Sequence, residues 1–380
     1  MKASILTIFL SISIFVFPGV KITGGPYLQK MGEHEVTIIW TTNTNAVSWL
    51  ELKADSTNLT YFDTAQGIKK IGKFHSITLK GLSPGTEYGY RVFSKNVLLH
   101  SAYRSSFGNT VSSVKKGQDF HYFKTLDKSK ESLSIKVIND IHGKDKGLSA
   151  MLSGVDRLNT DFVFFNGDMT NVLNNERQIF KGFMNASVDI FAKEVPVFYA
   201  RGNHETRGRA NTELYKYFPS STGNFYYAFR DGPVYFMVID VGEDKADSHK
   251  HYSGLAAYAQ YRSEQQDWVE KIVASPEFQA APFRVVIMHI PPSGSRWRLE
   301  EGVEDKLIPA LNNANIDVVL SGHNHVYSFT NTGENPTYNF PILVNAAETW
   351  LDINIDTTIN IKRRDMNGNI LNTHIFNQKK

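Results

Sequence analysis

The 380-residue sequence contains no cysteine. This absence excludes a disulfide-stabilised scaffold, thiolate metal ligands and a cysteine nucleophile, and it leaves the redox compartment open. The formal net charge is only +3 and no polybasic run stands out, which argues against a protein dedicated to nucleic-acid binding. What is present is the composition of a folded protein, with 41% hydrophobic and 12% aromatic residues. The length of the chain favours two domains.

An apolar run from residue 5 to residue 17 follows Lys2, and Pro18 and Gly19 end it. A charged start, a short apolar stretch and a helix breaker are typical of a secretory signal peptide. The run is shorter than the ~20 residues that span a bilayer. We therefore predict a signal peptide at residues 1–20 and an exported protein (periplasmic, secreted or at the cell surface) with no stable membrane partner. Because no Ala-x-Ala-like cleavage site is evident, an uncleaved, tethered form stays open.

Residues 21–126 have the pattern of an all-β domain. Short β-branched or alternating runs predict strands at residues 36–41, 49–52, 75–79, 87–92 and 120–124. Residues 100–118 show no clear period and are predicted to be a long loop. Around the turn at Pro84 and Gly85, residues 81–88 make this domain similar to a fibronectin type III sandwich. A sandwich by itself implies no chemistry.

Beyond a charged connector at residues 127–131, strands alternate with helical stretches. Strands are predicted at residues 134–138, 162–166, 197–200, 234–239, 284–289 and 317–321, and helices at residues 148–158, 176–192 and 264–274. This alternation predicts an α/β domain over residues 132–380 with buried strands. Residues 341–376 return to short strands, which we expect to complete a sheet at its edge.

Side chains that can bind metals follow five of these strands. They are Asp140 and His142, Asp168, Asn203 with His204 and Glu205, His289, and His323 with His325. In an extended loop, residues two apart project to the same side, so each Asp or His pair of this spacing can converge on one cavity. Glycine precedes three of the motifs, where the backbone has to turn sharply without a Cβ in the way. Because α/β sheets open their binding crevices at strand ends, we expect one common site.

Imidazole, carboxylate and amide donors suit Zn, Mn, Fe or Co rather than Cu(I) or an iron–sulfur cluster. A single histidine is more often a surface residue or a hydrogen-bonded core residue than a ligand. Five short motifs in one order, each at the end of a strand, make coincidence implausible. The sequence therefore predicts a transition-metal site.

Together these motifs resemble those of the calcineurin-like metallophosphoesterases. The fibronectin-like domain and residues 263–268 make the chain from about residue 25 onward similar to the purple acid phosphatase branch. The resemblance implies a four-layer α/β/β/α domain and a centre of two metal ions, Zn, Mn or Fe. One metal would be bound by Asp140, His142, Asp168 and His325. The other would be bound by Asp168, Asn203, His289 and His323, so that Asp168 bridges the two.

Two positions depart from the purple acid phosphatase pattern. That branch usually has Gly in place of His142, and in place of Asn171 it has a Tyr that binds ferric iron and gives the purple colour. The ligand set here is that of ordinary metallophosphoesterases, so the resemblance does not extend to an iron(III) cofactor.

The resemblance implies hydrolysis of small phosphate esters by a phosphatase-like mechanism, in which a hydroxide between the metals attacks phosphorus in line. His204 would protonate the leaving oxygen, or alternatively would only hydrogen-bond to the metal-binding residues. Glu205 and Arg201 are expected to support the site. Two alternatives stay open: a phosphodiesterase on the same centre, and a non-catalytic exported binding protein that keeps the fold.

Two other hydrolase classes are not supported by the motifs. A zinc metalloprotease motif would need a second histidine at the position of Gly208. The one Gly-x-Ser-x-Gly match, at residues 81–85, lies in the turn of the predicted fibronectin-like domain and not between a strand and a helix, where a serine hydrolase needs it. Residues 242–254 and 293–301 are expected to be solvated loops that decide the substrate. Within them, an arginine such as Arg296 or Arg298 is the expected contact to a phosphate.

Overall fold

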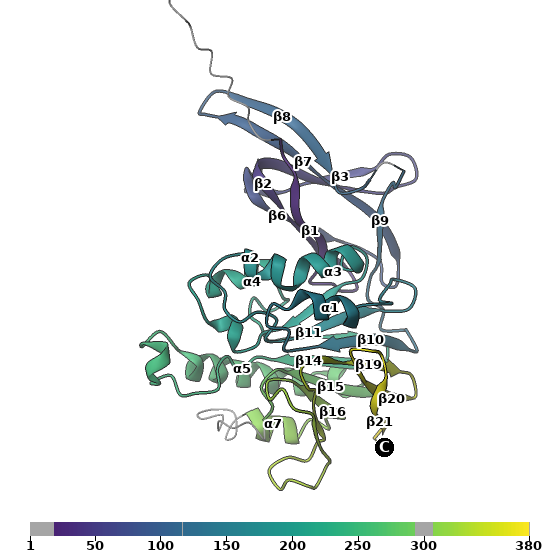
Figure 1. The fold of residues 1–380 in the computed structure, drawn as a ribbon. Helices are drawn as coiled ribbons and strands as arrows, with labels where there is room; N and C mark the ends of the chain where they lie inside the picture. Colours follow the sequence, from purple (N-terminus) through teal and green to yellow (C-terminus); the bar gives the residue numbers. More distant parts are fainter. Residues whose placement is uncertain (1–18, 116, 293–306, 380) are drawn as a thin grey trace, which may run out of the picture.

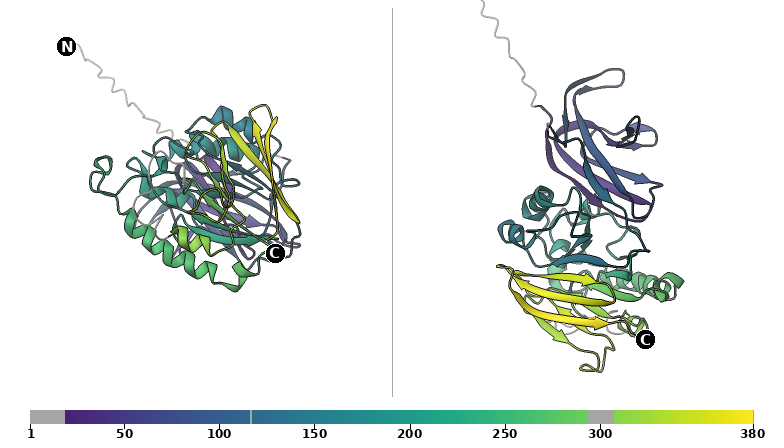
Figure 2. Two further views of the ribbon diagram at one scale, coloured as in Figure 1. Left: turned by 90° about the horizontal axis from the view of Figure 1, so that it is seen from below. Right: turned by 90° about the vertical axis from the view of Figure 1, so that its right-hand side faces the viewer.

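The computed structural model describes residues 19–115, 117–292 and 307–379. A β domain at the N-terminal end stands on a larger α/β domain (Figures 1 and 2). This arrangement confirms the predicted fold class, an all-β domain followed by an α/β domain. The predicted signal peptide lies outside the described residues except for its last two positions, Gly19 and Val20.

The N-terminal domain is built around two long strands in one seven-stranded sheet. Its strands are β1 (Ile22–Gln29), β2 (Glu35–Leu52), β3 (Leu59–Phe62), β6 (Gly72–Lys80), β7 (Glu87–His100), β8 (Ser105–Ser112) and β9 (His121–Lys124), and β4 (Thr64–Ala65) and β5 (Ile68–Lys69) form a separate ribbon. The runs predicted at residues 36–41 and 49–52 belong to the single strand β2. Its inward residue Trp40 is fully buried, and Trp40 Nε1 donates to Ser94 Oγ at 3.0 Å.

Residues 100–118 are not a long loop, and the sequence prediction is wrong here. β7 runs on to His100, and β8 returns antiparallel to it. The side chains of β8 are all exposed or half-exposed. No side chain of β8 is buried on either face of the hairpin, so the alternation that marks a strand in a sequence is absent from this segment. β8 forms because it pairs with β7, and no local pattern in the sequence indicates this pairing.

The α/β domain contains two six-stranded sheets. The first has the order β12 (Val197–Ala200), β11 (Phe162–Asn166), β10 (Leu133–Ile138), β19 (Thr349–Ile355), β20 (Thr358–Asp365) and β21 (Ile370–Asn377). The second has the order β13 (Tyr227–Asp231), β14 (Val234–Ile239), β15 (Phe283–Met288), β16 (Val318–Ser321), β18 (Ile342–Val344) and β17 (Ser328–Thr330). Residues 341–376 thus enter both sheets. Since β19 pairs with β10 in the middle of the first sheet, this segment does more than complete an edge.

Alternate residues of a buried strand face different layers, and this produces the four-layer packing. Phe162 and Phe164 of β11 belong to the core between the sheets, together with Phe236 of the second sheet. Val163 and Phe165 lie in another core, beneath the helices on the outer face of the first sheet. A third core lies between the second sheet and its own helices. The predicted α/β/β/α architecture is confirmed.

The helices fall into two groups, one on each outer face (Figure 1). The first group is α1 (Asp145–Met151), α2 (Arg177–Ile179), a π-helical turn (Phe180–Met184), α3 (Asn185–Ile190) and α4 (Leu214–Tyr217). The second is α5 (Tyr258–Val273), α6 (Pro276–Gln279) and α7 (Ile308–Asn312). The helix predicted at residues 176–192 is confirmed as the run from α2 to α3. The predicted starts were late for both α1 and α5, and the predicted continuation of α1 to residue 158 is wrong, because the helix ends at Met151.

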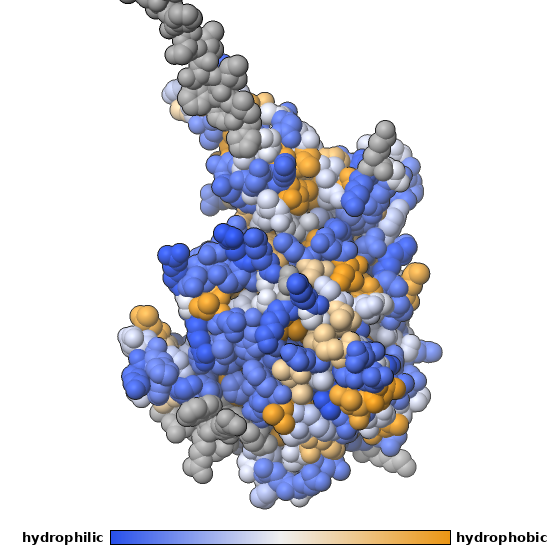
Figure 3. Space-filling model, in the orientation of Figure 1, coloured by the Kyte–Doolittle hydropathy of each residue, from blue (hydrophilic) through white to orange (hydrophobic). Residues whose placement is uncertain are grey.

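Side chains of the N-terminal domain tie it to the α/β domain. Tyr27 Oη donates to Tyr217 O at 3.0 Å, and Tyr90 Oη donates to Lys193 O at 2.8 Å. The surface seen in Figure 3 is mainly hydrophilic, with apolar residues gathered in smaller patches. Within the described residues, no helix has both the length and the apolarity to cross a membrane.

Candidate metal centre

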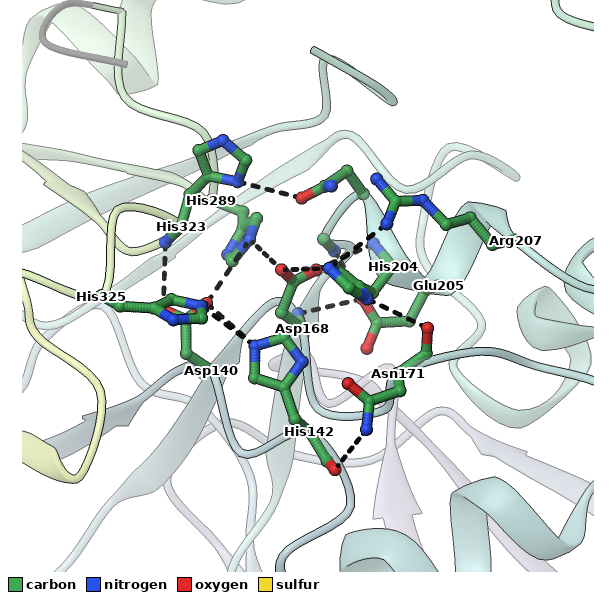
Figure 4. A network of polar contacts seen from close by, with 12 residues as sticks. Asp140, His142, Asp168, Asn171, His204, Glu205, Arg207, His289, His323 and His325 are labelled. Atoms are coloured by element: carbon green, nitrogen blue, oxygen red, sulfur yellow. Dashed lines mark hydrogen bonds and ion pairs between the residues drawn. The ribbon is translucent and has the colours of Figure 1, made fainter. Parts of the chain in front are cut away.

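The loops that follow the parallel strands of both sheets meet at one place (Figure 4). Asp140 and His142 follow β10, Asp168 follows β11, Asn203 and His204 follow β12, His289 follows β15, and His323 and His325 follow β16. Because the strands within each set are parallel, their carboxyl ends lie on the same side. Residues from five separate motifs therefore come together.

The backbone of this region is strained. Positive φ angles between 52° and 68° occur at five non-glycine residues of the motifs: Asp140, His142, Asp168, His323 and His325. Side chains other than glycine rarely adopt this left-handed conformation, which costs on the order of 1–2 kcal/mol per residue. In Figure 4 these side chains point toward one another. The strain is therefore concentrated where the donor atoms converge.

Glycine is required beside the donors because the loops approach closely. A Cβ at Gly167 would lie 2.4 Å from the ring of His289, and a Cβ at Gly202 would lie 2.2 Å from the backbone N of Asp168. Gly167 also has a positive φ of 80°. The glycines that precede the motifs were predicted to let the backbone turn sharply. They also let neighbouring loops pack closely against each other.

Asp140, His142, Asp168 and His325 form one candidate metal-binding group, since a donor atom of each lies within 4.8 Å of the others. From Asp140 Oδ1, His325 Nε2 is 3.2 Å away and His142 Nε2 is 3.8 Å away. The two Nε2 atoms are 3.0 Å apart. Asp140 Oδ1 is buried and, among the described residues, accepts no hydrogen bond. A buried carboxylate oxygen that faces imidazole nitrogens in this way fits a transition-metal cation.

Asp168, His289 and His323 form a second group by the same measure. Asn203 adjoins it, with its Oδ1 3.0 Å from His323 Nδ1. His289 Nε2 lies 3.2 Å from Asp168 Oδ2. His289 Nδ1 lies 2.7 Å from Asn166 O and donates to that carbonyl, so that in a neutral ring Nε2 carries the lone pair. Asp168 belongs to both groups, as a bridging ligand would.

Burial and neighbouring charges shift the pKa values of His289 and Asp168 in opposite directions. Burial lowers the pKa of His289, but the carboxylate of Asp168 outweighs it, and the pKa rises to about 10. Burial raises the pKa of Asp168, but the charges of His289 and His204 hold this pKa well below its ordinary value. Burial lowers the pKa of His323 to about 4. The buried carboxylates thus need positive charge beside them, which a proton on His289 supplies here and a bound cation would supply in its place.

Glu205 is fully buried and ties two loops of the centre together. Its Oε2 accepts from the backbone N of Asp168 at 2.9 Å and of Gly202 at 3.0 Å, and its Oε1 accepts from a third backbone N–H. Burial, followed by the charge of Asp168, raises the pKa of Glu205 to about 7. Arg201 pairs with Asp240 at 2.7 Å. Both residues have the contacts expected of supporting residues.

His204 lies at the rim of the centre, with its side chain 28% exposed. Its Nδ1 donates to the carbonyl of Asn171 at 3.0 Å, and its backbone N donates to Asp168 Oδ1 at 2.9 Å. Its Nε2 is 3.9 Å from Asp168 Oδ2 and 3.3 Å from Arg207 Nη1. His204 stands outside both donor groups, so its ring is available to a molecule bound at the centre.

Comparison with known proteins agrees with this geometry. Residues 133–327 match the calcineurin-like phosphoesterase family, and residues 26–110 match the N-terminal domain of purple acid phosphatases. The chain belongs to the calcineurin-like phosphoesterase family. The resemblance inferred from the motifs is confirmed, as is the likeness of the N-terminal domain to the purple acid phosphatase branch.

Two plant proteins are similar to this chain. Purple acid phosphatase 22 of Arabidopsis thaliana is 24% identical over 273 residues, which cover 68% of this chain and 54% of the relative. Purple acid phosphatase 15 of the same plant is 25% identical over 153 residues, which cover 36% of this chain and 26% of the relative. The chain thus spans between about a quarter and about half of the length of these relatives.

A solved structure of PhoD shares the fold of this chain. The TM-score is 0.57, and the match covers 95% of this chain and 92% of that chain. The two sequences are 12% identical over the match. At this level of identity the likeness concerns the fold alone.

Three polar residues near the candidate centre were missed by sequence reasoning. Arg207, beside His204, pairs through Nε with Glu243 Oε1 at 2.9 Å. Asp244 Oδ2 lies 3.9 Å from His323 Nε2. The place of Arg207 three residues after His204 was a usable signal. The two acidic residues gave none, because they belong to a loop whose position in space no local pattern reveals.

Of the two loops that were expected to decide the substrate, the structure describes the first but not the second. Residues 245–254 are half-buried or exposed, as expected of a solvated loop, but Glu243 and Asp244 before them are 1% and 4% exposed. Their carboxylates contact residues of the centre rather than solvent. Residues 293–301, including Arg296 and Arg298, lie outside the described residues.

Proposed function

We propose that this protein is a phosphatase-like enzyme that hydrolyses small phosphate esters with two transition-metal ions, Zn, Mn or Fe. The observation that carries the proposal is the carboxylate of Asp168, which two donor groups share. One ion would be held by Asp140, His142, Asp168 and His325, and the other by Asp168, Asn203, His289 and His323. When bound, such ions supply a nucleophilic water near neutral pH and neutralise charge on the phosphoryl oxygens.

His204 is proposed to protonate the leaving oxygen. Its Nδ1 is committed to the carbonyl of Asn171, so Nε2 is the atom that can carry a proton to the substrate. Arg207 offers a second positive group 3.3 Å away, and a guanidinium suits a phosphoryl oxygen. A protonated Nε2 cannot accept a hydrogen bond from Arg207. The contact between these two residues therefore has to open when His204 acts as the acid.

The centre is proposed to work without a tyrosinate ligand. Asn171 Nδ2 donates to the carbonyl of His142 at 3.0 Å, and its own carbonyl accepts from His204. Asn171 therefore orders the two histidines through its amide and backbone. This supports a centre that does not require iron(III).

We also propose that the protein is exported. The apolar run at residues 5–17, after Lys2, supports this. Fractionation of cells that express the full chain tests it, with the N-terminus of the purified protein determined by mass spectrometry. Protein found only in the cytoplasm with an intact N-terminus would contradict export.

One experiment tests the enzymatic function. The purified protein is stripped of metal, reloaded with Mn, Zn or Fe, and assayed on aryl phosphate monoesters and diesters while bound metal is quantified. We expect about two metals per chain and hydrolysis that returns with the metal. A protein that binds two metals but hydrolyses no ester would instead be a binding protein that keeps the fold. A protein that binds no metal would exclude the two-metal centre.

A further inference from the structure

A cavity of about 310 Å³ opens directly beside the first donor group. Asp140, His142 and His325 form part of its wall. The proposed hydrolytic chemistry, which needs the two donor groups and His204, does not account for this space. A cavity that shares three residues with a catalytic centre is placed to hold part of a substrate.

The wall away from the donor group is mainly apolar. It includes Ile141 and Met151, which are buried, and Met366, which is half-buried. Two exposed charged residues, Lys144 and Glu348, also line the cavity. A Cβ at Gly147 would lie 3.5 Å from Met366 Cε, so the lack of a side chain at Gly147 keeps the cavity open. Thioether side chains adapt to ligands of varied shape. Since a void of ~150 Å³ is enough to bind benzene, this cavity has room for an aromatic ring or a short alkyl chain.

His142 separates this cavity from His204. The His142 ring lies 4.8 Å from the His204 ring and 5.0 Å from the His325 ring, and Figure 4 shows it between them. His204 is not among the described residues that line the cavity. A phosphoryl group bound at the centre therefore has space for two substituents. One would lie beside His204 and Arg207, and the other would lie in the cavity.

We propose that the cavity binds the non-leaving substituent of a phosphodiester, an apolar aryl or alkyl group. This inference rests on the proposed function. The oxygen of water bonds to phosphorus, the P–O bond to the alcohol on the side of His204 breaks, and that alcohol departs with a proton. The second substituent stays esterified, and the product is a monoester. A monoester substrate leaves the cavity empty and forgoes its binding energy, so diesters with an apolar second group are the preferred substrates.

The first test keeps the leaving group constant and varies the other substituent. The metal-loaded protein is assayed on p-nitrophenyl phosphate, methyl p-nitrophenyl phosphate and phenyl p-nitrophenyl phosphate. An apolar pocket distinguishes groups that differ by one methylene about 10–200-fold. We therefore expect kcat/KM for the phenyl diester to exceed that for the methyl diester by about tenfold or more.

Two variants of α1 connect this preference to the cavity. Gly147→Leu directs a side chain toward Met366 and should reduce the ratio of phenyl to methyl kcat/KM to near one. Leu is favoured over Gly in a helix by roughly 0.8 kcal/mol, so the fold is expected to be kept. Ala150→Leu adds similar bulk at an exposed position of the same helix that does not line the cavity. This control should keep both the ratio and the basal activity.

A binding measurement tests the cavity without turnover. The protein is labelled with [¹³C]methyl-methionine, and the signals of Met151 and Met366 are assigned with Met→Leu variants. Diphenyl phosphate, which lacks an activated leaving group, is titrated into the metal-loaded protein. We expect both methyl signals to shift in the wild type and in Ala150→Leu, and to stay in place in Gly147→Leu.

The outcomes separate the two proposals. If p-nitrophenyl phosphate is hydrolysed but the two diesters react alike and the methionine signals do not move, the cavity inference is wrong and the proposed function stands. If the metal-loaded protein hydrolyses none of the three esters, the proposed function fails and the inference fails with it. A phenyl preference that survives in Gly147→Leu would also overturn the inference.

Discussion

The two domains differ in where their backbones are strained. In the N-terminal domain, the described non-glycine residues with positive φ are Lys30 and Gln66 alone. At the candidate centre, five of the seven proposed metal ligands have this conformation. The backbone of the N-terminal domain forms its strand pairs almost entirely with ordinary φ angles. In the α/β domain, the strained φ angles are concentrated in the loops that follow the strands. Strain of this kind persists only where the surrounding structure over-determines it, and here three buried cores do so.

This difference implies that similar substitutions have different consequences in the two domains. In the N-terminal domain they should change stability. At the centre they should change metal binding and turnover as well. The contrast can be tested with matched pairs of variants.

The largest contrast is expected for Asp→Asn substitutions. Asp168→Asn keeps the shape of the side chain but removes the charge that two donor groups share, so both metals should weaken and turnover should fall by about 10²-fold or more. Asp63 is buried in the N-terminal domain and pairs with Lys70 at 2.6 Å. Asp63→Asn should cost about 1–3 kcal/mol of stability and leave metal content unchanged. Elemental analysis, turnover and thermal unfolding are measured for both. Normal metal occupancy and turnover in Asp168→Asn would show that Asp168 does not bridge.

Within the centre, His204 should be separable from the ligands. His204→Ala should lower turnover by roughly 10²–10⁴-fold, the usual worth of a positioned proton donor, and should keep its metal. The loss should be large for a poor alkoxide leaving group and smaller for nitrophenolate. His289→Ala should lose metal and hydrolyse every ester poorly. Rate is measured against leaving-group pKa, with metal quantified in each variant. If His204→Ala empties the site, or slows good and poor leaving groups equally, His204 is not the general acid.

A third comparison uses one glycine from the backbone of each domain. At Gly81 of the N-terminal domain, φ is 73° and an added Cβ would meet no atom within 4 Å. Gly81→Ala should cost only the left-handed strain, on the order of 1–2 kcal/mol. At Gly167, φ is 80° and the Cβ would also lie 2.4 Å from the His289 ring. Gly167→Ala should cost about 3 kcal/mol or more, since overpacking adds to strain, and should weaken the metal that His289 holds. Denaturant unfolding and metal content are the measurements, and equal unfolding free energies would refute the contrast.

Acid should weaken the N-terminal domain through two buried histidines, and in the metal-free protein His323 of the centre, whose pKa is also lowered to about 4, should add to this loss. Burial lowers the pKa of His75 and of His121 from 6.5 to about 4. Their contribution to stability is complete above pH 6.5 and is lost as pH falls from 6.5 toward 4, by up to about 3 kcal/mol each. The pKa of His289 is raised to about 10. In the metal-free protein its contribution is therefore fully present below pH 6.5 and is lost only as pH rises toward 10.

Thermal unfolding of the metal-free protein between pH 7 and pH 4 checks this pH dependence. The unfolding temperature should fall across the range, and His121→Gln should reduce the fall because one of the buried histidines is removed. An unfolding temperature that does not change with pH would contradict the assignment.

The smallest expected effect concerns colour. The N-terminal domain matches that of purple acid phosphatases, but the centre has Asn171 where that branch has its tyrosine. The iron-loaded protein should show no intense visible absorption, because Asn171 provides no phenolate and His142 cannot replace it. Asn171→Tyr is the matched variant, in which a band is expected if the position faces the metal. An intense tyrosinate–iron band in the unchanged protein would contradict the ligand assignment.

Local patterns found the buried elements and missed the exposed ones. The strands predicted at residues 134–138 and 162–166 coincide closely with β10 and β11 because every second residue packs into the core between the sheets, and in β11 Val163 and Phe165 pack into a second core. β8 was missed because none of its side chains is buried. The start of α5 was missed because the residues of its first turns give no clear apolar stripe, and only tertiary contacts extend the helix back to Tyr258.

The chemistry that this protein can support, metal binding by histidine, carboxylate and amide side chains, could be predicted from the amino-acid sequence. The donor types, the glycines before them and the order of five motifs at strand ends were all readable, because each depends on residues close together in the chain. The tertiary structure decided which donors share a metal group, which acidic residues surround them, and that a cavity lies beside His142. These facts depend on distances between loops from two different sheets. Such distances follow from how the sheets pack, which spacing along the chain does not specify.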